Sequence, residues 1–343
     1  MRRLLNTLFV VSEDVYLALE GENVVVSKDG EQAGRVPLHT LENILSFSYK
    51  GASPALMGKC ARDGIGLAFY TPTGRFLART CGESRGNVLL RKEQYRRSDD
   101  LNASCRIAKQ FVIGKVYNSR WVLERATRDH PLRLDVQAVK HASDLLGRAL
   151  ADIAACDTLE RLRGLEGESA ARYFGALDQL LLQNKEEFAF TGRSRRPPLD
   201  RFNALLSFIY ALLANQCAAA LEGVGLDSYV GFMHRDRAGR NSLALDLMEE
   251  FRSILGDRLA LTLINNRIVR PEHFELRENG AVLLNDDGRK AVLAAWQERK
   301  RETLTHPFLE EKLAWGLVPH IQALLLARYL RGDLDEYPPF LWK

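Results

Sequence analysis

The stretch from Leu89 to Arg125, LLRKEQYRRSDDLNASCRIAKQFVIGKVYNSRWVLER, divides the sequence into two parts with different patterns. Its apolar residues recur every three or four positions over a long span, which is the spacing of an amphipathic helix. Upstream of it, apolar residues come in short, often alternating runs separated by turn residues, which is the pattern of strands. The stretch therefore predicts a β part before it and a helical part from it onward.

Residues 1–86 predict a small β domain. Short apolar runs such as TLFVVS and NVVVSKDG are separated by glycine, aspartate and lysine. Asp29-Gly30 is a hairpin signal, because this pair suits the two central positions of a tight turn. One helix is expected over residues 53–64, and a second hairpin follows with its turn at 72–74. Short strands with exposed edges also predict that two copies of the chain pair through this domain.

Residues 87–343 predict a larger all-helical domain, so the expected fold class is α+β. A basic, aromatic loop, NKEEFAFTGRSRRPP, interrupts the helices at 184–198, and Asp200 is expected to cap the helix after it. The tail DEYPPFLWK, residues 335–343, is expected to be extended and peripheral. After the first long helix, further helices are expected at 134–155, 157–183, 199–222, 242–267, 288–301 and 308–331.

The composition is that of a soluble globular protein of 343 residues, long enough for two or three domains. The net charge of +4 permits a nucleic-acid partner without requiring one. The sequence has five cysteines and no C-x-x-C spacing, which argues against a disulfide framework or zinc knuckle and favours a reducing cytoplasm. The start, MRRLLNTLFVV, lacks the long apolar run and the cleavage site of a signal peptide.

One uncharged window, FNALLSFIYALLANQCAAAL at residues 202–221, is about long enough to span a bilayer. It contains Asn203, Ser207, Asn215 and Gln216, which are more polar side chains than a lipid-facing helix carries. The window therefore predicts a central helix that other helices surround on nearly all sides.

The stretch GFMHRDRAGRNSLALDLMEEFR carries the first candidate site residues. Asp246 and Glu249 lie three residues apart on a predicted helix and share one face, and their leucine neighbours place that face near the core. Two carboxylates near the core repel each other and are poorly solvated. Either one of them is protonated, or a cation lies between them, or one forms a plain salt bridge with Arg252 or Arg240. His234 precedes them in a loop rich in glycine and arginine.

Glu166, in RLRGLEGESAARYF, is the remaining candidate, and it could instead offset the dipole at a helix N-terminus. If these groups assemble, one imidazole with two or three carboxylates suits Mg²⁺ or Mn²⁺, and suits calcium less well. Arginines around such an ion would bind an anion, and the combination indicates phosphate chemistry. The sequence has no P-loop, nucleophile-elbow or H-E-x-x-H motif.

Four segments together resemble the CRISPR-associated adaptation integrase family, the first of the numbered Cas proteins (Cas-one). The resemblance covers essentially the whole chain, and the order and spacing of the segments are far more specific than any single motif. The N-terminal half and the lack of extra domains are most similar to the version in subtype I-C systems. The segments are LRGLEGESAARYF, RRPPLDRFNALLSFIYALL with Asn203 and Tyr210, GLDSYVGFMHRDRAGRNSLALDLMEEFR, and SFSYKGASPALMGKCARDGIGLAFYTPTGRF.

The resemblance implies a β-sandwich-like N-terminal domain, a helical catalytic domain, a homodimer, and assembly with the small Cas-two dimer and the Cas-four nuclease. It also implies that three residues are catalytic and hold the metal. Glu166 matches the glutamate of the family's E-G motif, His234 the histidine of its G-F-x-H motif, and Glu249 the final acid, which is aspartate in many members. Asp246 matches a neighbouring aspartate, which either contacts the ligands without touching the metal or binds a further ion.

The expected function is that of a metal-dependent DNA endonuclease and integrase that inserts short foreign fragments into a CRISPR array. The 3′-hydroxyl of a fragment would attack a phosphodiester at the edge of a repeat, in double-stranded or branched DNA. Two alternatives stay open: a standalone, transposon-linked integrase of the same fold, and a non-catalytic scaffold that binds nucleic acid. The candidates for phosphate contacts are Arg193, Arg195, Arg196, Arg235, Arg237 and Arg240.

Overall fold

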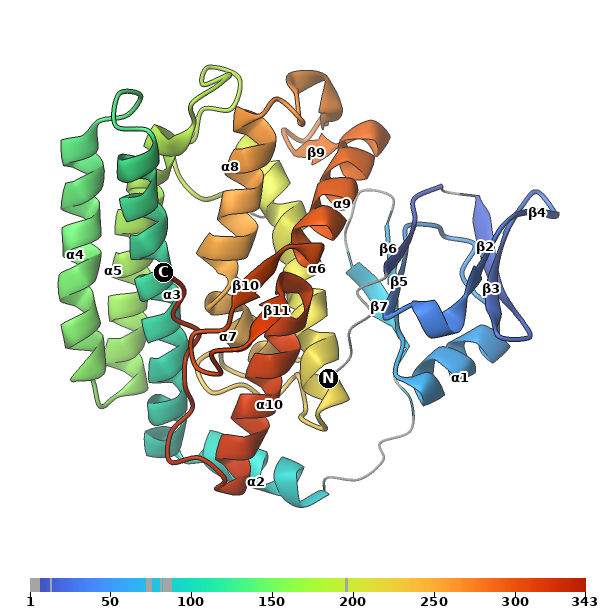
Figure 1. Cartoon of the computed structure of the whole chain (residues 1–343), viewed down its shortest axis with the longest axis horizontal. Helices are drawn as coiled ribbons and strands as arrows, with labels where there is room; N and C mark the ends of the chain where they lie inside the picture. Colours follow the sequence, from blue (N-terminus) through green and yellow to red (C-terminus); the bar gives the residue numbers. More distant parts are fainter. Residues whose placement is uncertain (1–6, 13, 72–75, 81, 83–87, 195–196) are drawn as a thin grey trace.

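The computed structural model of the chain has a β part at the N-terminus and a largely helical part that makes up the rest (Figure 1). The structure describes residues 7–343 except 13, 72–75, 81, 83–87 and 195–196. The α+β class predicted from the sequence is confirmed. The predicted boundary between residues 86 and 87 lies outside the described residues.

Two sheets and one helix form the N-terminal part. Their bounds are β1 Thr7–Val10, β2 Val15–Glu20, β3 Asn23–Lys28, β4 Glu31–Pro37, β5 Asn43–Ser46, α1 Pro54–Asp63, β6 Gly66–Tyr70 and β7 Phe76–Arg79, with a 3-10 turn, η1, at Leu38–Thr40. The larger sheet has the order β1-β5-β6-β7 and is parallel except for β7, which runs antiparallel to β6. The smaller sheet, β2-β3-β4, is antiparallel.

The two sheets enclose a common core, to which α1 also contributes. Leu17 of β2, Ile44 of β5 and Leu56 of α1 belong to one buried cluster. The turn between β3 and β4 is the predicted hairpin, in which Asp29 and Gly30 have φ angles of 52° and 86°. These left-handed angles are the ones that a tight hairpin turn requires and that Asp-Gly tolerates.

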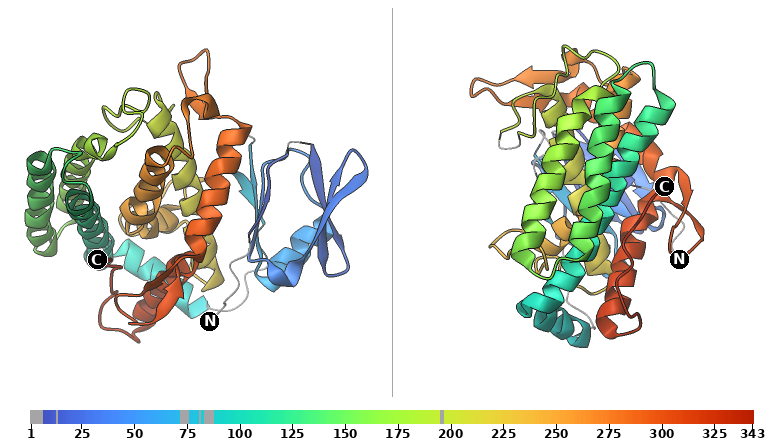
Figure 2. Two further views of the ribbon diagram at one scale, coloured as in Figure 1. Left: turned by 45° about the horizontal axis from the view of Figure 1, so that its top comes forward. Right: turned by 90° about the vertical axis from the view of Figure 1, so that its left-hand side faces the viewer.

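Among the described residues, the helical part contains nine helices and four shorter turns, together with two small sheets. Helices α3, α4 and α5 lie side by side at one edge of the molecule (Figure 1 and Figure 2). The helices are α2 Val88–Asp99, α3 Leu101–Asp129, α4 Val136–Ala154, α5 Leu159–Leu177, α6 Arg201–Gly223, α7 Ser242–Glu249, α8 Arg258–Asn265, α9 Asp286–Arg301 and α10 Val318–Arg331, with shorter turns η2 Asp178–Leu180, η3 Arg252–Asp257, η4 Pro271–His273 and η5 Trp315–Leu317.

The helical part differs from the all-helical prediction at two short antiparallel hairpins. These are β8 Phe274–Leu276 with β9 Val282–Leu284, and β10 Thr303–Thr305 with β11 Lys312–Ala314. The helix expected from residue 308 therefore begins only at Val318. Three-residue strands are too short to show a clear alternation of apolar and polar residues, so the sequence pattern did not indicate them, and β11 was included in the helix expected from residue 308.

The helix expected at 242–267 is also interrupted, because η3 is a π-helical turn between α7 and α8. Gly256 in this turn lies against a tyrosine of α6: a Cβ at residue 256 would be 2.9 Å from Cε1 of Tyr210. The widened turn and the missing side chain together let the two segments pack closely. π-helical turns inside helices are frequent at functional sites.

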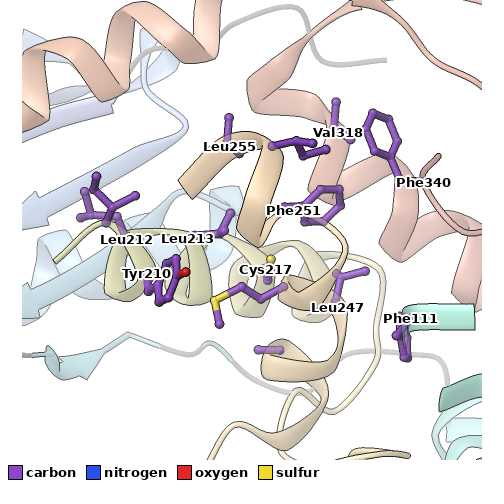
Figure 3. Packing of buried hydrophobic residues seen from close by; sticks show 14 of the residues in the cluster. Phe111, Tyr210, Leu212, Leu213, Cys217, Leu247, Phe251, Leu255, Val318 and Phe340 are labelled. Carbon is purple, nitrogen blue, oxygen red and sulfur yellow. The ribbon is translucent and has the colours of Figure 1, made fainter. Parts of the chain in front are cut away.

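Helix α6 is the centre of the main hydrophobic core. It is long and apolar enough to cross a membrane, but 67% of its most apolar window is buried inside the protein, so the prediction of a central helix is confirmed. Figure 3 shows Leu213 and Cys217 of α6 beside Leu247 of α7 and Phe251, within one buried cluster. Asp200 caps α6 as predicted, since its carboxylate accepts a hydrogen bond from the backbone N–H of Asn203 at 2.7 Å.

Candidate metal centre

Asp246 holds the loop that carries His234. Its side chain is fully buried, and it accepts hydrogen bonds from the backbone N–H groups of Phe232 at 2.7 Å, Met233 at 3.0 Å and His234 at 3.0 Å. It also accepts one from Nδ1 of His234 at 2.6 Å. These four donors occupy the lone pairs of both carboxylate oxygens, so Asp246 is engaged in shaping the loop and orienting the imidazole.

The loop can wind this closely around the carboxylate because residue 231 is glycine. A Cβ at Gly231 would lie 2.8 Å from Cβ of Ser242 and 2.9 Å from Oδ2 of Asp246. An ionised carboxylate only accepts hydrogen bonds, so Nδ1 of His234 donates in this contact and Nε2 is the ring nitrogen left to bind a metal. A neutral imidazole with a free Nε2 is the form that binds a metal.

Glu166 lies in the middle of α5, which begins at Leu159 after the cap residue Thr158. The alternative that Glu166 offsets the dipole at a helix N-terminus is therefore wrong. One turn earlier, Arg163 donates hydrogen bonds from Nε and Nη2 to the carbonyl of Met233 at 3.0 and 2.7 Å. This bidentate contact brings the helix of Glu166 next to the loop of His234.

Glu249 is at the end of α7, one turn after Asp246, and its side chain is 3% exposed. Its Oε1 pairs with Nη2 of Arg252 at 2.8 Å, which is the salt bridge that the sequence left open. Its Oε2 lies 2.7 Å from Nζ of Lys115, and the same ammonium pairs with Glu166. Glu166 and Glu249, 83 residues apart in sequence, thus converge on one cation.

The charges around Glu249 keep it ionised. Burial raises its pKa, but the charges of Arg252 and Lys115 outweigh burial and hold this pKa at about 2. Asp246, one turn earlier on α7, holds the ring of His234. Glu249 is therefore a carboxylate, not a carboxylic acid, at neutral pH.

Two features of the site were not predicted from the sequence: Lys115, and the contacts of Arg252 with Tyr210 and of Tyr210 with Asp257. The available signal was a lysine on the apolar stripe of α3, one turn after Phe111. The guanidinium of Arg252 stacks over the ring of Tyr210 at 5.0 Å, and the Tyr210 hydroxyl donates to Asp257 at 2.5 Å. Burial raises the pKa of Asp257 to about 6, against the lowering effect of its tyrosine hydrogen bonds.

A divalent ion needs several oxygen or nitrogen donors arranged around one point. In the part of the chain that the structure describes, no three His, Cys, Asp or Glu side chains are grouped closely enough to hold a metal as they stand. Lys115 lies between Glu166 and Glu249 instead. The buried Oε2 of Glu249 has the Lys115 ammonium as its cation, at 2.7 Å. Two carboxylates that already share a cation, beside an imidazole, fit Mg²⁺ or Mn²⁺.

The predicted phosphate-binding arginines have different surroundings. Arg235 and Arg237 are exposed in the loop after His234, and Arg240 is half-buried. Arg193 points inward, donating from Nη1 to Oδ1 of Asn203 at 2.6 Å, from Nη2 to the Ser207 hydroxyl at 3.1 Å, and stacking over Tyr210. Arg195 and Arg196 lie outside the described residues.

Comparison with known proteins assigns the family. The profile described as "CRISPR associated protein Cas1" matches residues 8–298. The chain belongs to the Cas1 family. It is 52% identical to "CRISPR-associated endonuclease Cas1 2" of Rhodospirillum rubrum and 48% identical to "CRISPR-associated endonuclease Cas1 1" of Chlorobaculum tepidum, in both cases over the full length of both chains.

Solved Cas1-like structures agree with the fold. A "Casposase bound to integration product" has a TM-score of 0.84 at 21% identity, covering 98% of this chain and 93% of that one. A Cas1 protein from Thermotoga maritima has a TM-score of 0.81 at 21% identity, covering 95% and 97%. Among more distant relatives, a "CRISPR-associated exonuclease Cas4/endonuclease Cas1 fusion" of Geobacter sulfurreducens is 34% identical over 97% of this chain and 60% of the fusion. A "Cas6-RT-Cas1--Cas2 complex" has a TM-score of 0.79 at 23% identity, covering 98% of this chain and 36% of that one.

Proposed function

We propose that this Cas1-family protein is a metal-dependent DNA integrase and endonuclease that inserts short foreign DNA fragments into a CRISPR array. The observation that carries the proposal is the convergence of Glu166 and Glu249 on one cation beside an imidazole that Asp246 orients. Full-length identities of about one half to named CRISPR-associated endonucleases support the same class of function.

Glu166, His234 and Glu249 would hold one Mg²⁺ or Mn²⁺ ion. When bound, the ion supplies Lewis-acid stabilisation of the negative charge that develops on the reacting phosphate. Asp246 accepts the Nδ1 proton of His234, so that Nε2 would be the ligand atom. Because its own oxygens are occupied, Asp246 acts as the positioning residue for His234 and does not bind a further ion.

The proposed reaction exchanges one phosphodiester for another. The 3′-hydroxyl of the incoming fragment attacks the phosphorus at the edge of a repeat, and the 3′-oxygen of the cut strand leaves. Lys115 and Arg252 supply positive charge next to the carboxylates, where the attacked phosphate has to lie. No protein nucleophile takes part, and attack by water in place of the 3′-hydroxyl gives simple cleavage.

DNA reaches the site along its basic loops. Arg235 and Arg237 are the exposed candidates for phosphate contacts, with Arg240 next to them. Arg195 and Arg196 keep this role as predictions from the sequence. Arg193 has the same role only if it exchanges its internal contacts for a phosphate.

The partners proposed for this chain follow from its relatives and from its β domain. The Cas4/Cas1 fusion and the complex that contains Cas1 and Cas2 support assembly with a Cas2 dimer and a Cas4 nuclease. Strand β4 is an edge of the smaller sheet and most of its residues are exposed, which supports a homodimer through this domain. The proposal also places the protein in a subtype I-C system and in the cytoplasm.

The two alternatives make different predictions. The casposase structure is similar in fold, but at 21% identity it does not favour a transposon-linked role over CRISPR adaptation. The near-half identity to Cas1 endonucleases over the whole chain favours CRISPR adaptation. A non-catalytic scaffold would bind DNA without cleaving or joining it.

The test is cleavage and strand joining on branched DNA with Mg²⁺, with Mn²⁺ and with EDTA. We expect metal-dependent products from wild type, and at least about a hundredfold less from Glu166→Ala or His234→Ala. Glu168→Ala on the same helix and His141→Ala are matched controls, because both side chains are exposed. Full activity of Glu166→Ala and His234→Ala would place the catalytic centre elsewhere, and a wild type that binds but never cuts would favour the scaffold.

A further inference from the structure

Lys115 touches two of the three proposed metal ligands. Its ammonium pairs with Glu166 and with Glu249, and its side chain is only 7% exposed. The preceding residue, Gly114, lets α3 approach this closely, since a Cβ there would lie 2.9 Å from Cγ of Glu250. The ammonium is therefore built into the interior, between the two carboxylates.

The charges at this point balance before any metal binds. Glu166 and Glu249 contribute two negative charges, and Lys115 and Arg252 contribute two positive charges. A divalent ion on the same carboxylates would add two positive charges to a partly buried place that already holds Lys115 and Arg252, and like charges repel strongly there. The carboxylate of Asp246 behind His234 offsets one of these charges, and the phosphates of bound DNA supply further negative charge.

Of the two cations, Lys115 has the more flexible side chain. The guanidinium of Arg252 is stacked over Tyr210 at 5.0 Å and belongs to the π-helical turn η3. A lysine has a flexible four-carbon stem and a compact ammonium that binds phosphate as readily as carboxylate. When Lys115 turns toward a phosphate oxygen, it releases Glu166 and Glu249.

We propose that Lys115 is the resident counter-cation of Glu166 and Glu249, and that it couples metal binding to DNA binding. Without DNA, the ammonium competes with the divalent ion for both carboxylates. With DNA, a phosphate pairs with Lys115 and both carboxylates become available to the ion. The site then takes up its metal together with its substrate. This inference rests on the proposed function, because it uses the same carboxylates as metal ligands.

The experiment is a titration of the full-length chain with Mn²⁺, followed by electron paramagnetic resonance of the free ion, with and without a branched DNA. For wild type we expect the Mn²⁺ Kd to fall at least about tenfold when DNA is present. Lys115→Met removes the charge at similar length. Without DNA, we expect this variant to bind Mn²⁺ at least about tenfold more tightly than wild type does. The fold increase in its Mn²⁺ affinity when DNA is added should be at least about fivefold smaller than for wild type.

Lys115→Arg is the matched control, because it keeps the positive charge and should retain weak Mn²⁺ binding in the absence of DNA. Circular dichroism checks that each variant is folded. Measurements on wild type alone already test the proposal, because equal Mn²⁺ affinity with and without DNA would overturn it. A folded Lys115→Met protein that binds Mn²⁺ no more tightly than wild type without DNA would overturn it as well.

Two more variants separate this inference from the proposed function. If Glu166→Ala and His234→Ala bind Mn²⁺ as wild type does, the ion is not held here and the proposed function fails. If both lose Mn²⁺ while Lys115→Met matches wild type, only the role of Lys115 fails. The Glu166→Ala protein with DNA also measures the Mn²⁺ that DNA binds by itself.

Discussion

The carboxylate of Glu250 accepts a hydrogen bond from the backbone N–H of Phe340, 90 residues later in the sequence, at 2.7 Å. The same carboxylate accepts hydrogen bonds from the Tyr337 hydroxyl at 2.5 Å and from Nε2 of Gln322 at 2.9 Å. Glu250 directly follows Glu249, so the C-terminal tail is attached to the end of the helix that carries a proposed ligand. The prediction of a peripheral tail is wrong, because Tyr337 and Phe340 are buried.

Asn118 connects this tail to α3. Its Nδ2 donates to the carbonyls of Glu250 at 2.7 Å and Phe340 at 2.8 Å, and its Oδ1 accepts from the backbone N–H of Trp342 at 2.9 Å. Phe340 also packs against Phe251, with ring centroids 5.8 Å apart (Figure 3). The tail, α3 and the end of α7 thus form one packed unit behind the candidate site.

Replacing Phe340 by alanine tests the contribution of the tail to stability. The ring is fully buried, and removing a buried phenylalanine leaves a cavity, so Phe340→Ala should lower the free energy of unfolding by about 3–5 kcal/mol. Urea denaturation measures this change. Glu336→Ala, four residues earlier and exposed, should change it by less than about 0.5 kcal/mol. A loss below about 1 kcal/mol for Phe340→Ala would show that the tail is only loosely packed.

The stability of the protein should depend on the ionisation of Glu250. Burial raises its pKa to about 8, although hydrogen bonds from Tyr337, Phe340 and Gln322 oppose the rise. The folded state therefore binds a proton that the unfolded state, with its ordinary pKa near 4.5, has released. Between these two values stability falls as pH rises, by roughly 1.4 kcal/mol per pH unit, and above about pH 8 this contribution no longer changes.

Urea denaturation at pH 6.5 and pH 8 checks this pH dependence. Wild type should lose roughly 2 kcal/mol over the interval through Glu250 alone. Glu250→Gln cannot titrate, so this part of the pH dependence should be missing whatever the variant's absolute stability. Glu278→Gln, at an exposed glutamate, should keep it. Identical pH dependences for wild type and Glu250→Gln would mean that Glu250 is ionised throughout.

Much of the fold could be predicted because local patterns determine it. The Asp29-Gly30 turn, the cap at Asp200 and the buried helix α6 follow from turn chemistry, capping and polarity, which involve residues near one another in sequence. The buried tail could not be predicted in this way. Its burial depends on Glu250 and Asn118, which are far away in sequence, and the tail itself has no periodicity.

The candidate site shows the same division. His234, Asp246 and Glu249 stand close together in the sequence, so their common location could be inferred from spacing. Lys115 could not, because a single lysine on an apolar helix face gives no indication of its partners. Its pairing with Glu166 and Glu249 arises only when α3, α5 and α7 pack against one another. The sequence therefore indicated the negative charges of the site but missed Lys115, one of the two cations that balance them.

Asp246→Asn tests whether Asp246 positions His234. The amide keeps the size of the side chain. Its NH₂ group, however, cannot accept the hydrogen bonds that the loop N–H groups now donate to a carboxylate oxygen. We expect Mn²⁺ affinity, measured in the presence of DNA, to fall about 10–100-fold, because the imidazole loses the partner that fixes its tautomer. Asp236→Asn in the same loop is exposed and is the matched control. Unchanged Mn²⁺ binding by Asp246→Asn would show that Asp246 is dispensable for orienting the ring.

The exposed arginines of the His234 loop should contribute to DNA affinity but not to sequence preference. Phosphate contacts are electrostatic, so the double variant Arg235→Ala/Arg237→Ala should weaken binding to different DNA sequences alike. If each arginine contacts one phosphate, the slope of log affinity against log salt should fall by about two units. Fluorescence anisotropy at several salt concentrations measures both quantities.

A control for this arginine prediction must remove the same charge from another place. Arg106 and Arg148 are exposed on α3 and α4, and replacing both by alanine lowers the net charge by the same amount. If DNA is attracted only by overall charge, the two double variants should weaken binding equally. If the loop contacts phosphates, Arg235→Ala/Arg237→Ala should show the larger change in slope, while its Mn²⁺ binding without DNA stays as in wild type, because neither arginine is a proposed ligand. Equal slopes for the two double variants would leave the loop arginines as ordinary solvated side chains.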